Sequence, residues 1–230
     1  MTDYKMEAAK EALKFIEQGQ NIGLGAGSSI AHLINLIAAD TTLAESLTFV
    51  SSSFNTLSLL AERGLKIKSA AQTDYLDFYF DGCDQFDIEL NALKSGGGIH
   101  LNEKILASIA EEFILIGDAG KYVKQLNTTY PLVIEVIPNA LIFVSNWLKQ
   151  HFPEARVNTR ISTQKDGAVI SDNGNLLIDI YFHELIQLDK LNIIIKILPG
   201  VVEHSLFYRI ASRAIIAGKD GVQILRPLYD

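Results

Sequence analysis

The sequence predicts an α/β fold, a doubly wound, mostly parallel sheet with a smaller inserted α+β domain. Short apolar runs typical of buried strands alternate with helical periodicities up to about residue 137. Two glycine-rich loops stand between a strand-like run and a helix-like run. After about Gln150 the pattern changes to runs separated by turn residues. We therefore expect a main domain from residues 1–128 plus 200–230 and a smaller domain from residues 129–199.

The expected helices follow from apolar spacing and from the residues that end each run. The first run ends at Gly19 and a later one at Gly64, a residue type that commonly follows the last helical turn. Trp147, with Leu141, Val144 and Leu148, fits the core face of a further helix. The main-domain helices are expected at 6–16, 30–38, 54–63 and 101–112.

The expected strands are the short apolar segments between these helices and the later runs bounded by turns. Residues 172–175, Asp-Asn-Gly-Asn, lie between two runs that can pair as a hairpin, and Lys-Asp-Gly at 219–221 marks a tight turn. Strands are expected at 21–25, 47–51, 78–81, 113–117, 133–137, 192–198 and 214–217.

Composition limits the classes of function. The chain has 230 residues, 20 Lys and Arg against 27 Asp and Glu, a net charge of −7 and 48% hydrophobic residues. A packed core is expected, whereas general binding to nucleic acid or an anionic membrane is disfavoured, because phosphate affinity comes mainly from Lys and Arg. The amphipathic first segment does not resemble a signal peptide, and no apolar run is long enough to span a membrane. We expect a cytoplasmic protein.

The first glycine-rich loop, GLGAGSS at 23–29, is a candidate anion site. It lacks the third glycine of a dinucleotide fingerprint, since Ser28 stands there, and it lacks the lysine of a P-loop. Glycines allow close backbone approach, Ser28 and Ser29 add hydroxyl donors, and a helix N-terminus favours negative charge. A purely structural turn from strand to helix explains the same residues.

Asp81 ends the strand at 78–81 and Asp84 follows it, at the carboxyl end where ligands of open α/β sheets gather. Two adjacent carboxylates can raise one pKa or attract a cation. The spacing does not match an EF-hand calcium loop. A solvated acidic loop is the alternative interpretation.

The second glycine-rich loop carries Lys94 and leads to Glu103 in the first turn of a helix. An acid at that position can simply complement the helix dipole. The functional interpretation makes Glu103 a general base beside the cationic Lys94. Because both glycine loops and the acids fall near strand ends of one sheet, the joint pattern favours an active site.

The remaining reactive residues do not form a recognisable metal or nucleophile site. The histidines lack ligand spacing, so we expect no metal. Cys83 is the single cysteine, which excludes an internal disulfide, and its acidic neighbours oppose thiolate formation. The histidines are His32, His100, His151, His183 and His204.

Taken in order, the motifs resemble those of the ribose-5-phosphate isomerase A family. GLGAGSS resembles the family's phosphate loop, DFYFDGCDQFD its DGADE segment, and LKSGGGIHLNEKILASIAEEFILIGDAGK its KGGG, REK and DASK elements. PLVIEVIP, SDNGNLLIDI, LPGVVEHSLF and GKDGVQIL continue the similarity over nearly the whole chain. Each motif alone is weak, but their fixed order and spacing are specific.

The resemblance implies a metal-free aldose–ketose isomerase without a cofactor, interconverting ribose 5-phosphate and ribulose 5-phosphate through an enediol(ate). It implies that Glu103 moves the proton, that Lys94 stabilises the enediolate, and that Asp81 and Asp84 hold the sugar and assist proton exchange at its oxygens. A homodimer or homotetramer is implied as well. The implied substrate-binding residues are Ala26, Gly27, Ser28, Ser29, Gly82, Cys83, Ser95, Gly96, Gly97, Lys121 and Lys5.

Four departures from the family pattern bear on affinity and rate. Ala26 replaces a threonine, Gln85 an acid, Ser95 a glycine and Asn102 a frequent arginine. Two other interpretations of the same fold remain open: a non-catalytic sugar-phosphate sensor, and a related enzyme such as an amino-sugar phosphate isomerase/deaminase or a CoA transferase. The combination of DGxD, KxGG and Glu103 favours the pentose enzyme.

Overall fold

A six-stranded sheet forms the centre of the structure, a computed structural model that describes residues 2–184 and 186–228. Its strands are β1 (Asn21–Leu24), β2 (Thr48–Ser51), β3 (Leu76–Asp81), β6 (Ala110–Asp118), β12 (Arg213–Gly218) and β13 (Gly221–Leu225). They lie in the order β13-β12-β6-β3-β1-β2. All neighbours are parallel except β12 and β13. The predicted mostly parallel sheet is confirmed.

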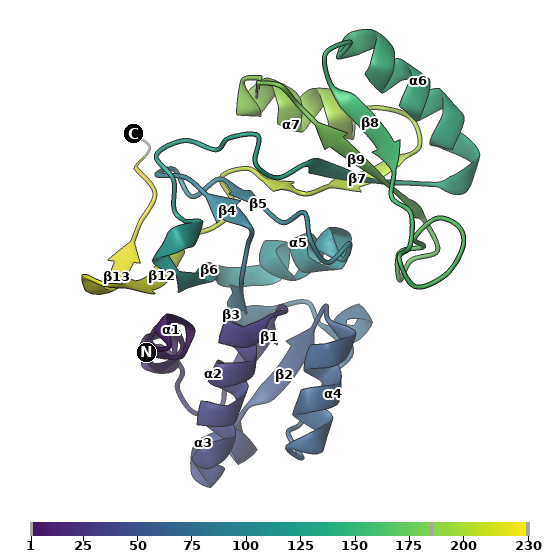
Figure 1. The fold of residues 1–230 in the computed structure, drawn as a ribbon. Helices are drawn as coiled ribbons and strands as arrows, with labels where there is room; N and C mark the ends of the chain where they lie inside the picture. Colours follow the sequence, from purple (N-terminus) through teal and green to yellow (C-terminus); the bar gives the residue numbers. More distant parts are fainter. Residues whose placement is uncertain (1, 185, 229–230) are drawn as a thin grey trace.

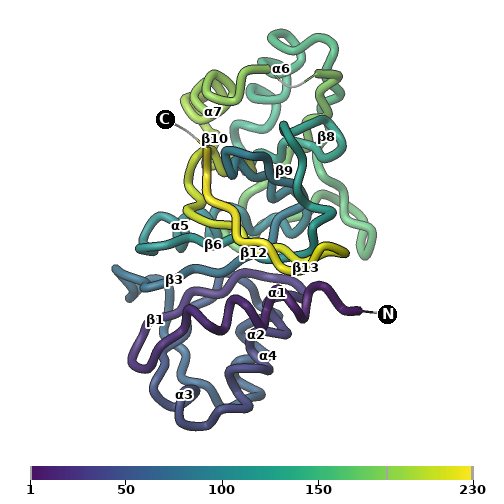
Figure 2. The backbone as a smooth tube through the Cα atoms, turned by 90° about the vertical axis from the view of Figure 1, so that its left-hand side faces the viewer, coloured from purple at the N-terminus to yellow at the C-terminus, as the bar shows by residue number. Residues whose placement is uncertain are grey.

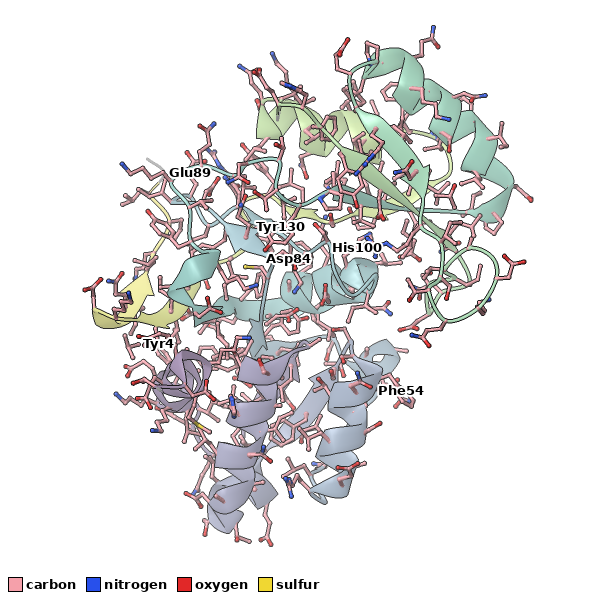
Figure 3. All side chains as sticks on the ribbon, in the orientation of Figure 1. Tyr4, Phe54, Asp84, Glu89, His100 and Tyr130 are labelled. Carbon is pink, nitrogen blue, oxygen red and sulfur yellow. The ribbon has the colours of Figure 1, made fainter. Side chains whose placement is uncertain are left out.

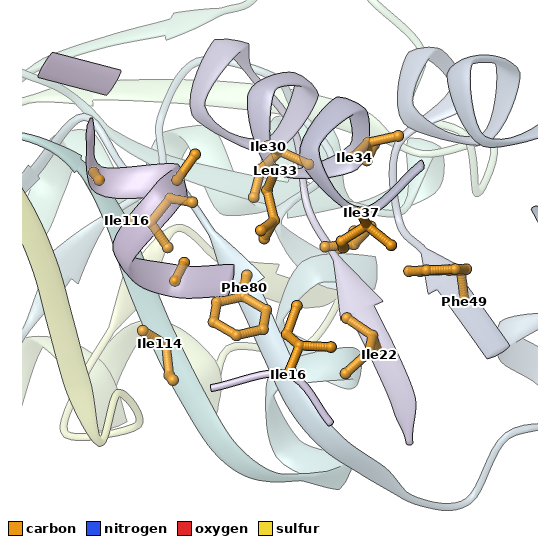
Figure 4. Packing of buried hydrophobic residues seen from close by; sticks show 14 of the residues in the cluster. Ile16, Ile22, Ile30, Leu33, Ile34, Ile37, Phe49, Phe80, Ile114 and Ile116 are labelled. Carbon is orange, nitrogen blue, oxygen red and sulfur yellow. The ribbon is translucent and has the colours of Figure 1, made fainter. Parts of the chain in front are cut away.

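Helices cover both faces of this sheet, as the α/β class requires. They are α1 (Tyr4–Leu13), α2 (Ser28–Ala39), α3 (Thr41–Ser46), α4 (Phe54–Glu62) and α5 (His100–Ile109). On one face, Ile30 and Leu33 of α2 pack with Phe80 and Ile116 from the strands (Figure 4). On the other face, Leu106 of α5 belongs to a separate buried cluster. The sheet is therefore buried between two layers, and its strand ends are held rigidly.

A second, antiparallel sheet lies beyond the main sheet, in the upper half of Figure 1. Its strands are β7 (Leu132–Val136), β8 (Arg156–Thr159), β9 (Leu176–Tyr181) and β10 (Val201–His204), in the order β10-β7-β9-β8. The helices α6 (Leu141–His151) and α7 (Leu188–Lys196) share a hydrophobic core with this sheet. Since β10 belongs to it, the second sheet continues past residue 199, where we expected the smaller domain to end.

Three short strands link the two parts of the molecule. They are β4 (Gln85–Phe86), β5 (Ala92–Leu93) and β11 (Leu206–Phe207), paired in the order β11-β5-β4. Figure 2, turned by 90° from Figure 1, shows the same division: the lower part is built around the main sheet and the upper part around the second sheet. The second glycine-rich loop, which carries Lys94, follows β5 directly.

Two expected elements are wrong. Residues 192–198 form most of helix α7 and its end instead of a strand, because Leu191 and Ile195 are buried one turn apart while Ile193 is exposed. The helix expected at 101–112 ends at Ile109, and strand β6 begins at Ala110. The β-branched isoleucines of residues 192–198 favour a strand, but packing of one helical face against the core selects the helix.

The two expected turns and the Trp147 helix face are present. The amide of Ser171 donates to the carbonyl of Asn175 at 2.8 Å around the first turn. A tight turn joins the antiparallel strands β12 and β13. Within α6, Val144 and Leu148 are fully buried, with Trp147 packed beside them.

Among the helices of residues 2–184 and 186–228, none has both the length and the apolar character needed to cross a membrane.

Candidate active site

A cavity of about 280 Å³ opens at the carboxyl ends of the main-sheet strands β1, β3 and β6. Both glycine-rich loops border it, so the topology brings together segments far apart in the sequence. Asp84, labelled in Figure 3, lies where the lower and upper parts of the molecule meet. The lining residues are Lys5, Ala26, Gly27, Ser28, Ser29, Asp81, Gly82, Cys83, Asp84, Lys94, Gly96, Gly97, Glu103, Ile116, Gly117, Asp118 and Lys121.

A lysine between two carboxylates forms the innermost part of this cavity. Lys94 Nζ lies 2.7 Å from Asp81 Oδ2 and 3.3 Å from Glu103 Oε1. The same ammonium group donates to the carbonyl oxygen of Gly82. The three charged side chains are each no more than 7% exposed. A cation and two carboxylates are therefore held together out of bulk water, where their charges act strongly.

Asp81 is fixed by donors on every side. Its Oδ1 accepts the N–H of Ala26 at 3.0 Å and of Gly82 at 2.7 Å. Its Oδ2 accepts the hydroxyl of Tyr79 at 2.7 Å, and that hydroxyl lies 3.3 Å from Ser52 Oγ. A carboxylate so fully bonded is suited to hold the neighbouring ammonium group in place.

Gly25 shows how closely the first glycine loop approaches this carboxylate. A Cβ at Gly25 would lie 1.9 Å from both Cγ and Oδ1 of Asp81. Only glycine fits there, so the loop has a structural requirement at this position as well as its expected role toward an anion.

Burial and charge shift the ionisation of the central pair. Burial raises the pKa of Glu103 to about 8, against the opposing effect of Lys94. Burial by itself would lower the pKa of Lys94, but Asp81 and Glu103 raise it above its usual value. Lys94 therefore stays cationic while Glu103 titrates near neutral pH, which is the property of an effective proton acceptor and donor.

Asp84 holds the second glycine loop. Its Oδ2 accepts the N–H of Ser95 at 2.6 Å and of Gly96 at 3.1 Å. The hydroxyl of Ser95 points elsewhere and donates to the carbonyl of Pro131 at 2.6 Å. Ser95 is thus the predicted substrate-binding residue that does not line the cavity, whereas Gly96 and Gly97 do.

The outer part of the cavity is suited to an anion. Ser28 and Ser29 begin helix α2, and Gly27 at its N-cap has φ of 104° and no side chain to occupy the free N–H groups. Lys5 of α1 and Lys121, which follows β6, complete this end. Free N–H groups, hydroxyls and ammonium groups together match the needs of a phosphate.

Ile116, Gly117 and Asp118 line the cavity from the end of β6 but are not among the expected site residues, although the DASK-like element begins at Asp118. An acid at a strand end was the available signal for Asp118, as it was for Asp81. Cys83 also lines the cavity, but burial raises the pKa of its thiol to about 12, so it does not form a nucleophilic thiolate. In the described part of the chain, no three His, Cys, Asp or Glu side chains are grouped to hold a metal ion.

Fold and site define an α/β protein with a buried carboxylate–lysine centre beside a helix N-terminus that is suited to an anion. The family model for ribose 5-phosphate isomerase A (phosphoriboisomerase A) matches residues 48–221. The ribose-5-phosphate isomerase A of Pyrococcus abyssi is 38% identical over 225 residues, covering 97% of each chain. The chain belongs to the ribose-5-phosphate isomerase A family.

Solved structures agree with this assignment. A D-ribose-5-phosphate isomerase in complex with phospho-erythronic acid superimposes with a TM-score of 0.91 at 36% identity, over 98% of this chain and 100% of that one. The ribose 5-phosphate isomerase A of Methanocaldococcus jannaschii gives a TM-score of 0.88 at 32% identity, over 96% and 97% of the two chains. The similarity includes both sheets.

Proposed function

We propose that this chain interconverts D-ribose 5-phosphate and D-ribulose 5-phosphate through an enediol(ate), as part of the non-oxidative pentose phosphate pathway. One observation carries the proposal. Lys94 lies between Asp81 and Glu103 in a cavity that the N-terminus of α2 also lines. A phosphosugar has the matching distribution of groups, with a reactive carbonyl at one end and a phosphate at the other.

Glu103 acts as the base in the proposed reaction. In the open-chain aldose it takes the proton from C2, and the C–H electrons form the C1–C2 double bond while the carbonyl electrons move onto the C1 oxygen. Glu103 then returns the proton to C1 while the C2 hydroxyl proton is transferred to the C1 oxygen, so that a ketone forms at C2 and a hydroxyl at C1. The raised pKa of Glu103, about 8, suits both directions of transfer.

Lys94 stabilises the negative charge that develops on the enediolate oxygen. Its ammonium group is cationic, buried and fixed by Asp81, so it needs no reorganisation as the charge appears. Preorganised stabilisation of this kind is usually the largest catalytic contribution.

Asp84 binds a sugar hydroxyl, and the first glycine-rich loop, which leads into α2, binds the phosphate. Because Asp84 Oδ2 is bonded to the second glycine loop, its other oxygen is the one we assign to the sugar and to proton exchange during ring opening. The phosphate lies against Gly27, Ser28 and Ser29, with Lys5, Lys121 and Ala26 at its sides, while Gly82, Cys83, Gly96 and Gly97 form the walls around the sugar. Ser95 contributes through its N–H, which holds Asp84, and not by lining the cavity.

The ligand of the related complex supports the proposed substrate class. Phospho-erythronic acid, with which that isomerase was solved, carries a carboxylate and a phosphate. A planar carboxylate with its negative charge resembles the planar, negatively charged enediolate. A site that binds such a compound is complementary to the charged intermediate.

We further propose a cytoplasmic homodimer or homotetramer whose partner is the phosphosugar, without nucleic acid, membrane, metal or cofactor. The net charge of −7 supports the exclusion of polyanionic partners. Exposed Ile142 and Phe143 on α6 and Ile193 on α7 support self-association. Light scattering on purified protein would give the mass, and a monomer would overturn the oligomer proposal.

The deciding experiment measures isomerisation of ribose 5-phosphate by purified protein with EDTA present. We expect turnover with ribose 5-phosphate and little with unphosphorylated ribose. Glu103→Gln should lose turnover yet still bind inorganic phosphate, whereas Glu7→Gln, a change at an exposed helix position, should behave as wild type. Phosphosugar binding without turnover would instead identify a sensor, and full activity of Glu103→Gln would exclude it as the base.

A further inference from the structure

Arg160 connects the second sheet to the second glycine loop, although 64 residues separate it from Gly96. It follows strand β8 directly, and its backbone N–H donates to Leu177 of β9 at 2.8 Å. Its guanidinium group reaches the loop of the main part, where Nη2 donates to Ser95 O at 2.8 Å and Nη1 to Gly96 O at 3.1 Å. One side chain thus bonds two successive carbonyl groups of the loop that carries Lys94.

Asp179 fixes the guanidinium group in this orientation. Nε of Arg160 donates to both carboxylate oxygens of Asp179, at 3.0 and 3.1 Å, and Nη2 lies 2.6 Å from Oδ1. Asp179 lies on β9 opposite Asn158 of β8, so the pair is built on the sheet itself. Both side chains are largely buried, at 17% and 14% exposed. A planar, doubly paired guanidinium is a rigid donor, which a lysine cannot reproduce.

The opposite side of the same loop is bonded to the active site. The N–H groups of Ser95 and Gly96 donate to Asp84, while their carbonyl groups accept from Arg160. The loop is therefore clamped between a carboxylate that borders the cavity and an arginine of the second sheet. Gly98 adds a steric contact, because a Cβ there would lie 2.7 Å from Leu177 Cδ1.

The hydrogen bonds from Arg160 also polarise individual peptide groups of the loop. Gly96 O belongs to the same peptide group as the N–H of Gly97, a residue that lines the cavity. A cationic donor on the carbonyl polarises the peptide and strengthens its N–H as a donor. The same argument applies to Ser95 O and the N–H that Gly96 gives to Asp84.

We infer that Arg160, held by Asp179, is a positioning residue of the active site, fixing the glycine loop so that its N–H groups and Asp84 face the sugar. The effect of Arg160 on catalysis rests on the proposed isomerase function, whereas the hydrogen bonds by which Arg160 clamps the loop do not depend on it. It also gives the second sheet a role in the reaction.

The test compares Arg160→Lys and Asp179→Asn with wild type in two measurements. First, we expect kcat/KM for ribose 5-phosphate to fall about 10-fold to 100-fold, since misplacing a substrate-contacting group by a fraction of an ångström has effects of this order. Competitive inhibition by inorganic phosphate should stay within about twofold, since we assign the phosphate to the N-terminus of α2, to which the hydrogen bonds of Arg160 do not extend. A general loss of structure would lower kcat/KM and also weaken inhibition by phosphate.

Second, hydrogen–deuterium exchange of the segment 94–99 should speed up in both variants, with or without substrate. Arg156→Lys is the matched control, because Arg156 lies on the same strand β8 and stacks 4.3 Å over Tyr181 without contributing to the clamp. It should leave both measurements unchanged. Unchanged exchange at 94–99 in Arg160→Lys overturns the clamp even if wild type is inactive. Faster exchange with unchanged kcat/KM in an active enzyme overturns the positioning role.

Discussion

The ammonium nitrogen of Lys94 lies 3.3 Å from the carboxylate of Glu103, and both side chains are buried. This pairing places the group that we propose to stabilise negative charge directly beside the group that we propose to move the proton. Both can therefore reach the same two carbons of a small substrate. It also keeps a buried carboxylate available for ionisation, because the cation opposes the effect of burial on its pKa.

The activity should depend on pH through Glu103. Burial raises its pKa to about 8, and the base acts in its ionised form, so kcat/KM should rise with pH and level off above about pH 8. Measurements from about pH 6.5 upward avoid the second ionisation of the substrate phosphate, near pH 6. A profile that is flat from there to the alkaline side would contradict the assignment of Glu103 as base.

Replacing Lys94 with methionine should have two separable effects. Loss of the cation should lower kcat by about 10²-fold to 10³-fold, the usual cost of removing one stabiliser of a developing oxyanion. The rise of kcat/KM should also move to higher pH, because Lys94 lowers the pKa of Glu103. Steady-state kinetics over a pH series measures both. The exposed Lys124 provides the control variant Lys124→Met, which should match wild type.

The elements and many of the cavity residues could be predicted because their signals are local. Glycine loops before a helix, acids after a strand and a glutamate in a first helical turn are all visible in short windows of sequence. The positions of Asp81, Lys94 and Glu103 around one cavity follow from these local signals and from parallel strand order.

Long-range packing explains what the sequence did not reveal. Tyr79 lies two residues before Asp81 on β3 and shares its face of the sheet, but the contact of its hydroxyl with Ser52, which follows the strand β2, depends on how the strands pair. Arg160 lacks any local motif, since its partners are carbonyl groups far away in the chain. The isoleucine run in α7 favours a strand by its β-branched composition, whereas burial of Leu191 and Ile195 on one face selects the helix.

Tyr79→Phe should lower kcat without abolishing it. The hydroxyl of Tyr79 donates to Asp81 Oδ2, and burial raises the pKa of Tyr79 well above its usual value, so it remains a donor at all working pH values. Losing a hydrogen bond to a charged group costs about 1.5–3 kcal/mol, part of which we expect as a roughly tenfold loss of kcat. Tyr75→Phe removes an exposed hydroxyl that donates to Glu111, so it should leave kcat intact. Equal kcat for Tyr79→Phe and wild type would exclude a role for Tyr79 in positioning Asp81.

Glu203→Gln should destabilise the contact between α5 and β10. Glu203 Oε1 lies 2.9 Å from Lys104 Nζ, and Oε2 lies 3.0 Å from Lys196 Nζ. Burial opposes ionisation of Glu203, but Lys104 lowers its pKa to about 2. Because the folded-state pKa lies below the ordinary value, this carboxylate stabilises the fold above about pH 4.5, and the stabilisation disappears as the pH falls toward about 2.

Removing one partner of a largely buried pair leaves the other charge uncompensated, so we expect a loss of about 2–3 kcal/mol at neutral pH. Urea unfolding at a series of pH values measures it, and the difference from wild type should shrink below about pH 4.5 as Glu203 loses its charge in both states. Glu7→Gln removes the exposed pair with Lys10, so it should change stability by less than about 0.5 kcal/mol. A difference for Glu203→Gln that is just as small, or independent of pH, would show that the Lys104–Glu203 pair does not stabilise the helix that carries Glu103.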